Sequence, residues 1–215
     1  MAFIPSADDL EILLTEDLTW RIKEISALKS MIEKSAAGVA RSSALRAALP
    51  MLYAHWEGYI KRSADRYLAF VYDRRPLAIS LKPALAYAYL EPRFRGAGGG
   101  SSSFTPQAAI EFAERVKTVR TRANPNVMVN TKSNLRYEVL QEIVEGLAVP
   151  DFLEMTTKTK LNDHLCDKRN HIAHGESVPI TEDAFEELRL EFTELMRSFK
   201  DRLITAATNR EFLAV

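Results

Sequence analysis

The spacing of apolar residues is the feature of this chain that most limits its fold. Near the end of the sequence, apolar side chains recur every three or four residues, at Phe185, Leu188, Phe192, Leu195, Phe199 and Leu203. On a helix this spacing places them in one stripe, which must be buried against another surface. The segments 7–37 and 41–73 have similar stripes, whereas no segment alternates apolar and polar residues as a half-buried strand would. The sequence therefore predicts an all-α fold.

Residues with known preferences for helix ends indicate where these long helices begin. Ser6 is expected to cap the first helix, because a serine oxygen can accept a hydrogen bond from a free backbone N–H in the first turn. Thr181 is expected to do the same for the last helix. Pro50 lies inside the second apolar stripe and lacks a backbone N–H, so a kink or a break is predicted there.

Three shorter helices are expected between residue 105 and the last helix. One begins at Pro106, a favourable first helical residue, and reaches about residue 121. Ser133 or Asn134 is predicted to cap the next, which ends near Gly146. A third begins near Thr159. We expect residues 1–215 to form one domain, a bundle of long antiparallel helices.

Residues 77–130 interrupt the regular pattern and are predicted to be an insertion in the bundle. The segment LKPALAYAYLEP suggests a short helix between two prolines. It is followed by GAGGGSSS, Gly96 to Ser103, which holds four of the eight glycines of the chain. Such a composition is typical of a flexible linker or loop tip.

Composition and charge exclude some classes of protein. The 29 basic and 29 acidic residues cancel, which argues against a general nucleic-acid coat but allows a local basic cleft. Cys166 is the only cysteine, so no internal disulfide can form and a reducing compartment is expected. The first residues lack the pattern of a signal peptide, and no apolar run reaches the roughly 18–20 residues of a membrane span. We expect a cytoplasmic protein.

The polar stretch DKRNHIAHGE, residues 167–176, is the main candidate for a functional site. Arg169 is a permanent cation whose planar fork matches a phosphate group, and His174 can give and take a proton near neutral pH. Together they suit cleavage of RNA by attack of the 2′-hydroxyl on the adjacent phosphorus, which needs no metal. On an ideal helix the two side chains point about 140° apart. Gly175 is expected to end the helix that carries them.

Two other interpretations of this stretch remain open on the residues alone. His164, Asp167, His171 and His174 are spaced three, four and three residues apart, so on a regular helix they would lie along one stripe and could bind a divalent metal ion. The stretch could also be an ordinary solvated helix end, with a histidine near the negative end of the helix dipole.

Three segments resemble one known family. The run from Arg169 to Gly175, RNHIAHG, resembles the motif of HEPN domains, in which an arginine and a polar residue are followed by a histidine after a short spacer. YAHWEGYIK, residues 53–61, and TKSNLRYEVLQEIVEGL, residues 131–147, resemble helices of the RiboL-PSP-HEPN branch, also called the MAE-type. The resemblance covers most of residues 10–205 outside the region 77–105.

The resemblance implies a fold, an activity and roles for individual residues. HEPN domains are all-α bundles that often dimerise, and many are metal-independent endoribonucleases of toxin–antitoxin, antiviral or RNA-processing systems. By this likeness Arg169 would bind the phosphate, His174 would transfer the proton, and Asn170 would orient the arginine. The expected partners are RNA, a second copy of the chain, and an antitoxin or defence-system protein, with no cofactor. Other HEPN members are non-catalytic modules that bind a protein or nucleotide, and this remains the alternative.

Several further residues have a structural and a functional interpretation. His171 could contact substrate or simply face solvent, and Glu57 could pair with Arg169 or with Lys61 one turn away. Trp56 is expected in the core. A basic patch for the RNA backbone could include Lys158, Lys160, Lys168, Arg120 and Arg122. The tyrosines Tyr87 and Tyr89 could stack on bases or pack against the bundle.

Overall fold

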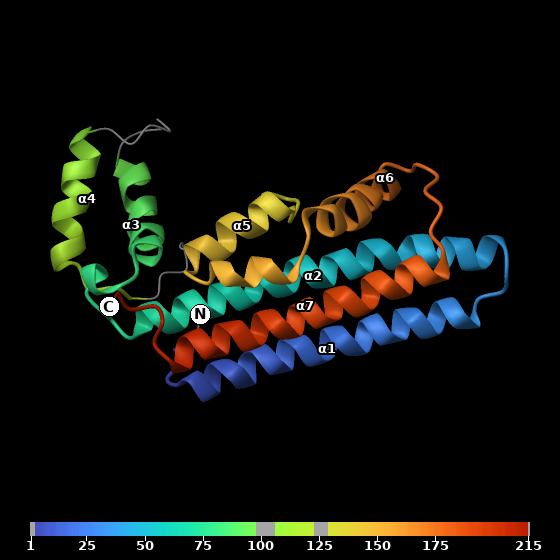
Figure 1. Ribbon diagram of the computed structural model, residues 1–215, viewed down its shortest axis with the longest axis horizontal. Coiled ribbons are helices and arrows are strands. Elements are labelled where there is room, and N and C mark those ends of the chain that lie inside the picture. The colour runs from blue at the N-terminus through green and yellow to red at the C-terminus, as the bar shows by residue number, and fades with distance from the viewer. Residues whose placement is uncertain (1–2, 98–105, 123–128, 215) are drawn as a thin grey trace.

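Three long helices lie side by side along the length of the molecule (Figure 1). A computed structural model describes residues 3–97, 106–122 and 129–214. The long helices are α1 (Ala7–Lys34), α2 (Val39–Asp73) and α7 (Glu182–Thr208), and α1 runs opposite to the other two. Within the described ranges there is no strand, only two isolated bridges. The predicted all-α bundle is therefore confirmed.

Shorter helices occupy one face and one end of this bundle (Figure 1). A 3-10 turn (Ala78–Ser80), α3 (Pro83–Ala97) and α4 (Pro106–Thr118) gather at the end of α2, which agrees with the predicted inserted region. The remaining elements lie along α2 and are α5 (Tyr137–Gly146), a 3-10 helix (Pro150–Met155), a π-helix (Lys160–Asp167) and α6 (Lys168–Ala173). Most of the stretch GAGGGSSS lies outside the described residues.

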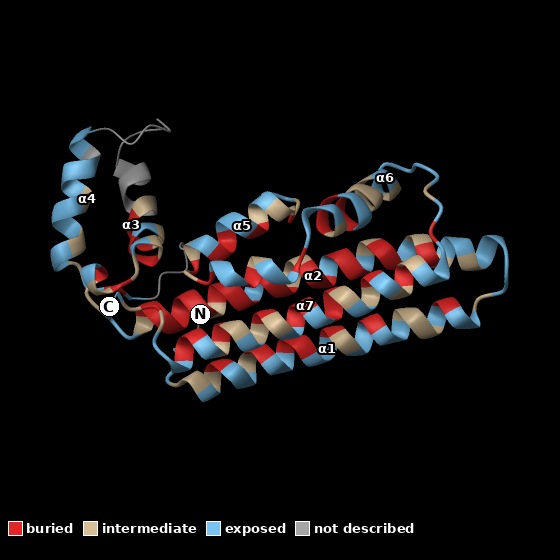
Figure 2. Cartoon of the chain, in the orientation of Figure 1, coloured by how far each residue is buried: buried red, intermediate tan, exposed pale blue. Residues whose placement is uncertain are grey.

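The core forms where the apolar stripes of the long helices meet (Figure 2). All six residues of the predicted α7 stripe are buried. Trp56 of α2 is fully buried, and its ring meets the edge of Phe192 at a centroid distance of 5.2 Å, so the prediction that it lies in the core is confirmed. Burial of this stripe holds α7 in the bundle, because each helical turn places another aromatic or leucine side chain against α1 and α2.

The predicted N-caps of the first and last long helices are present, whereas two prolines do not act as predicted. The Ser6 side chain accepts a hydrogen bond from the Asp9 N–H at 3.0 Å, and Thr181 accepts one from Ala184 at 3.2 Å, as predicted. Of the kink or break predicted at Pro50, the break does not occur, because α2 continues through this residue. Buried side chains on both sides of Pro50 hold the helix against its neighbours, and this packing outweighs one missing hydrogen bond. Likewise, α3 continues past Pro92 instead of ending there.

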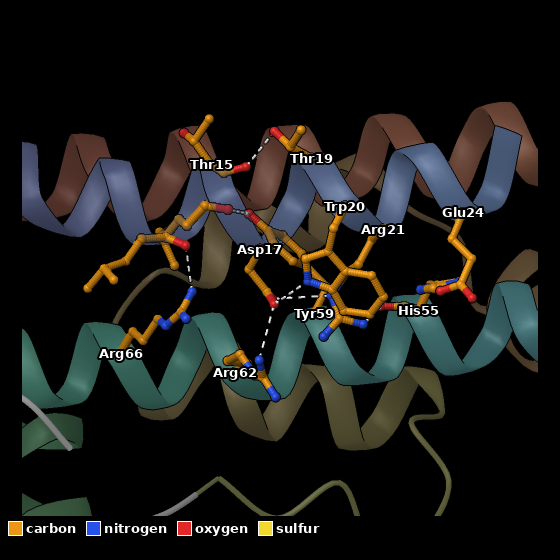
Figure 3. Close-up of polar contacts among 12 residues, drawn as sticks. Thr15, Asp17, Thr19, Trp20, Arg21, Glu24, His55, Tyr59, Arg62 and Arg66 are labelled. Carbon is orange, nitrogen blue, oxygen red and sulfur yellow. Dashed lines mark hydrogen bonds and ion pairs between the residues drawn. The ribbon is translucent and has the colours of Figure 1, made fainter. Parts of the chain in front are cut away.

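A buried ionic cluster joins α1 to α2 (Figure 3). The Asp17 and Arg21 side chains are only 2% and 6% exposed, and Arg21 Nε donates to Asp17 Oδ2 at 3.2 Å. Arg21 Nη1 also donates to the His55 carbonyl oxygen at 3.2 Å, across the interface. A Cβ at Gly58 would stand 2.9 Å from Arg21 Nη1, so the glycine makes room for the guanidinium.

No helix in the described part of the chain is both long and apolar enough to cross a membrane.

Candidate active site

The polar stretch that begins at Asp167 lies at the end of a helical segment with a changed register. Lys160–Asp167 is a π-helix, and it continues directly into α6. Gly175 then ends the segment, as predicted, with a φ of +81° that other residues rarely adopt. The Glu176 N–H donates to the His171 carbonyl at 2.9 Å, and the Gly175 N–H donates to the Ile172 carbonyl at 3.0 Å. These two bonds form a Schellman motif, which fixes the position of the last helical residues.

Arg169 points from α6 towards α2 and is half-buried there. Its guanidinium carbon lies 3.9 Å from the centroid of the Tyr53 ring, which is a cation–π contact. Its Nη2 donates to Asn134 Oδ1 at 3.4 Å, whereas its Nε is buried without a hydrogen-bond partner. Within the described residues, no carboxylate forms an ion pair with Arg169. The guanidinium is therefore held in place by groups that leave its charge uncompensated.

Two other arginines contrast with Arg169 because carboxylates neutralise them. Arg136, at the start of α5, forms an ion pair with Asp167, only two residues before Arg169. Arg189 on α7 binds both carboxylate oxygens of Glu186, each at 2.7 Å. An arginine without such a partner in a half-buried position favours an anion from outside the chain, and its donors fit a phosphate.

His174 lies at the C-terminal end of α6 and is exposed to solvent. Its backbone N–H donates to the Asn170 carbonyl at 3.0 Å, so the Schellman turn holds its backbone while its ring projects outward. In the part of the chain that the structure describes, no side-chain hydrogen bond of His174 is formed. An accessible imidazole without an internal partner can exchange a proton with a bound substrate.

The supporting candidates take different positions. Asn170 is half-buried beside Arg169 in sequence, and none of its side-chain atoms forms a hydrogen bond with another described residue. His171 is exposed, with Nδ1 at 2.7 Å from Glu176 Oε2. Glu57 is half-buried on α2, and neither of its expected ion pairs, with Arg169 or with Lys61, is formed among the described residues. Burial raises the pKa of the Tyr53 hydroxyl to about 12, and the negative charge of Glu57 acts in the same direction.

Tyr53 and Asn134 belong to this site, although the sequence interpretation gave them other roles. Tyr53 was expected in the buried stripe of the second long helix and in a HEPN-like segment, without a role at the site, and Asn134 was expected as a cap of α5. The N-cap of α5 is Arg136, and no side chain caps this helix, so the prediction of Ser133 or Asn134 as the cap is wrong. The Asn134 side chain turns to Arg169 and Tyr53 instead. A signal for both residues was present, since each lies in a segment that resembles the HEPN family.

Cys166 lies next to the polar stretch but is not suited to act as a nucleophile. Its side chain is buried and its Sγ lies 3.4 Å from the Leu135 carbonyl oxygen. Burial raises the pKa of the thiol to about 12, so the thiolate form is disfavoured at neutral pH. The protonated thiol packs in the hydrophobic core as a small apolar side chain.

The alternative metal site is not assembled in the described residues. No group of three histidine, cysteine or acidic side chains there lies close enough to share an ion. Asp167 pairs with Arg136, and His171 with Glu176. The π-helix contributes to this for one pair, because its i→i+5 hydrogen bonds widen the turn, so His164 and Asp167, three residues apart, no longer lie on one stripe.

Most of the basic and aromatic residues that were considered for RNA contacts interact with other groups of the chain. Lys158 pairs with Glu138, Lys160 lies 2.8 Å from Glu191, and Arg120 donates to a backbone carbonyl. Of the remaining basic residues, Lys168 is half-buried and Arg122 exposed. Tyr89 is buried, with its ring 4.9 Å from that of Tyr72, whereas Tyr87 is exposed with its ring 6.1 Å from Phe112. Three of the five basic residues are therefore already engaged by groups of the chain itself.

Comparison with known proteins identifies the family. Residues 16–205 match the model of the RiboL-PSP-HEPN family, a HEPN-type family. The match covers most of the chain, so the protein belongs to the RiboL-PSP-HEPN family, as its motif and two further segments indicated. No curated protein and no solved structure matches the chain.

Proposed function

We propose that this protein is a metal-independent endoribonuclease. The observation that supports this most strongly is Arg169, a half-buried guanidinium without a carboxylate partner among the described residues, which is followed one and a half helical turns later by the exposed imidazole of His174. An uncompensated cation can bind the phosphate of the RNA backbone, and an accessible histidine can move the proton. Membership of the RiboL-PSP-HEPN family supports the same activity.

The chemistry follows from these two groups. Neutral His174 removes the proton of a ribose 2′-hydroxyl, and the 2′-oxygen attacks the adjacent phosphorus while the bond to the 5′-oxygen breaks. The His174 imidazolium formed in this way then gives its proton to the leaving 5′-oxygen. Arg169 stabilises the negative charge that grows on the non-bridging phosphoryl oxygens. The products are a 2′,3′-cyclic phosphate and a 5′-hydroxyl, and Asn170 beside the arginine helps to orient the bound phosphate.

We also propose that two copies of the chain form one composite site. Arg169 points towards α2 and is half-buried, whereas His174 projects into solvent at the helix end. Such divergent side chains serve one phosphate more easily when arginine and histidine come from different protomers. The cellular role that fits a ribonuclease of this family is in a toxin–antitoxin or antiviral defence system, where a partner protein would restrain it.

The chemical ends of the RNA products test the proposed reaction. We expect fragments with 5′-hydroxyl ends, which polynucleotide kinase labels without prior phosphatase treatment, and 2′,3′-cyclic phosphates at the other ends. Both should form at the same rate in excess EDTA, because neither proton transfer nor charge stabilisation uses a metal ion. Fragments with 5′-phosphate and 3′-hydroxyl ends would contradict the reaction. If RNA is bound but not cut, the non-catalytic binding module is the better description.

A further inference from the structure

The turn before α5 has an unusual backbone. Lys132 and Ser133 are consecutive non-glycine residues in the left-handed region, with φ of 52° and 62°. This conformation is unfavourable for residues with a Cβ and persists only where surrounding contacts enforce it. Here the Lys132 N–H donates to Asn130 Oδ1 at 2.8 Å, and the Asn134 N–H donates to the Thr131 carbonyl at 3.1 Å. The result is that Asn134 leaves the helix start and turns towards Arg169.

A chain of hydrogen bonds then sets the orientation of the Asn134 amide. The Leu135 N–H donates to the Tyr53 hydroxyl oxygen at 2.7 Å, so the hydroxyl proton is directed elsewhere. It is donated to Asn134 Oδ1, at 3.2 Å, which also accepts from Arg169 Nη2. Because both neighbours of this amide are donors, its oxygen and not its nitrogen must face them. Such a chain strengthens its members cooperatively and fixes the acceptor in one place.

We propose that Asn134 and Tyr53 are positioning residues, which hold the guanidinium of Arg169 for RNA phosphate without neutralising its charge. The inference rests on the proposed function of Arg169. The Tyr53 ring supports one face of the guanidinium, and the amide oxygen of Asn134 fixes one of its edges. A carboxylate at position 134 would hold the arginine more tightly but would also compete with the phosphate for its charge. The neutral amide oxygen of Asn134 holds the arginine without competing with the phosphate for its charge.

Substitutions at position 134 separate positioning from charge. Asn134→Asp keeps the shape of the side chain but pairs Arg169 with a carboxylate, and kcat/KM for RNA cleavage should fall roughly 10–100-fold. Asn134→Ala should lower kcat/KM as well, because the guanidinium loses its fixed edge. The matched control is Asn130→Asp in the same turn, which makes the same change of charge and keeps the acceptor for Lys132. We expect this control to cut RNA within threefold of the parent rate, on the order of a surface change.

A second readout does not depend on RNA. The Nε–H signal of Arg169 in a nitrogen–proton NMR spectrum, assigned by its loss in Arg169→Lys, should be shifted by the Tyr53 ring and separated from exposed arginines. In Asn134→Ala and in Tyr53→Leu, the chemical shift of this signal should move towards the shifts of exposed arginines. In Asn130→Asp it should stay unchanged. If Asn134→Ala keeps both this signal and the parent rate, the positioning role is wrong. If the signal moves but the parent protein cuts no RNA, positioning holds and the proposed ribonuclease function fails.

Discussion

Replacing Arg169 with alanine should lower kcat/KM for RNA cleavage by about 10²–10³-fold, the usual effect of removing one group that stabilises transition-state charge. The free energy of unfolding should change by only about 1 kcal/mol, since the residue contributes one cation–π contact and one long hydrogen bond. Steady-state kinetics and urea unfolding of the same preparations measure both quantities.

Two further variants sharpen the test of Arg169. Arg169→Lys keeps the positive charge but loses the planar fork, so activity should recover only in part. Arg197→Ala is the matched control, because Arg197 is an exposed arginine on α7 whose contact is a surface pair with Glu194. It should leave kcat/KM and stability unchanged. Cleavage by Arg169→Ala at the parent rate would show that this guanidinium does not bind the reacting phosphate.

Replacing Asp17 with alanine should destabilise the bundle by about 3–5 kcal/mol, the cost of leaving a buried charge without its partner. The guanidinium of Arg21 is 6% exposed and is confined by the close approach of Gly58, so it cannot easily turn into solvent. Urea unfolding followed by circular dichroism measures the change. Glu11→Ala, an exposed acid on the same helix, should remain within about 0.5 kcal/mol of the parent protein.

A double substitution distinguishes the charge from the packing at this position. Asp17→Leu combined with Arg21→Met removes both charges together and should recover most of the lost stability, because a buried ion pair gains little over an apolar pair of similar volume. If Asp17→Ala alone is as stable as the parent protein, the prediction is contradicted. The charge of Arg21 would then not be buried in that variant, because solvent would have to reach its guanidinium.

The long helices were predictable because their signals are repeated and local. Six apolar residues at helical spacing each indicate the same helix, α7. Thr181 needs only the N–H of Ala184, three residues away, to act as its cap. The break that was one of two outcomes predicted at Pro50 does not occur, because the loss of one hydrogen bond is visible in the sequence, whereas the packing of α2 between its neighbours is not. Tertiary burial decides such cases against local preference.

The site was predictable in its motif but not in the groups around it. Arg169 and His174 could be chosen from the chemistry of two residues and a family likeness. Asn134 could not, because its role depends on two consecutive left-handed residues and on a tyrosine 81 positions earlier in the chain. The π-helix from Lys160 to Asp167 was also not indicated by the apolar pattern, and it moves His164 off the stripe on which the regular spacing had placed it with Asp167.

The most direct measurement incubates the purified protein with total tRNA and a structured RNA in excess EDTA, beside its His174→Ala variant. The parent should cut RNA, and the variant should be slower by about 10²–10⁴-fold, the usual contribution of a group that transfers a proton. His164→Ala, which removes another exposed histidine, should cut like the parent. Equal cleavage by His174→Ala, or loss of the parent activity in EDTA, would contradict a metal-independent ribonuclease that uses Arg169 and His174.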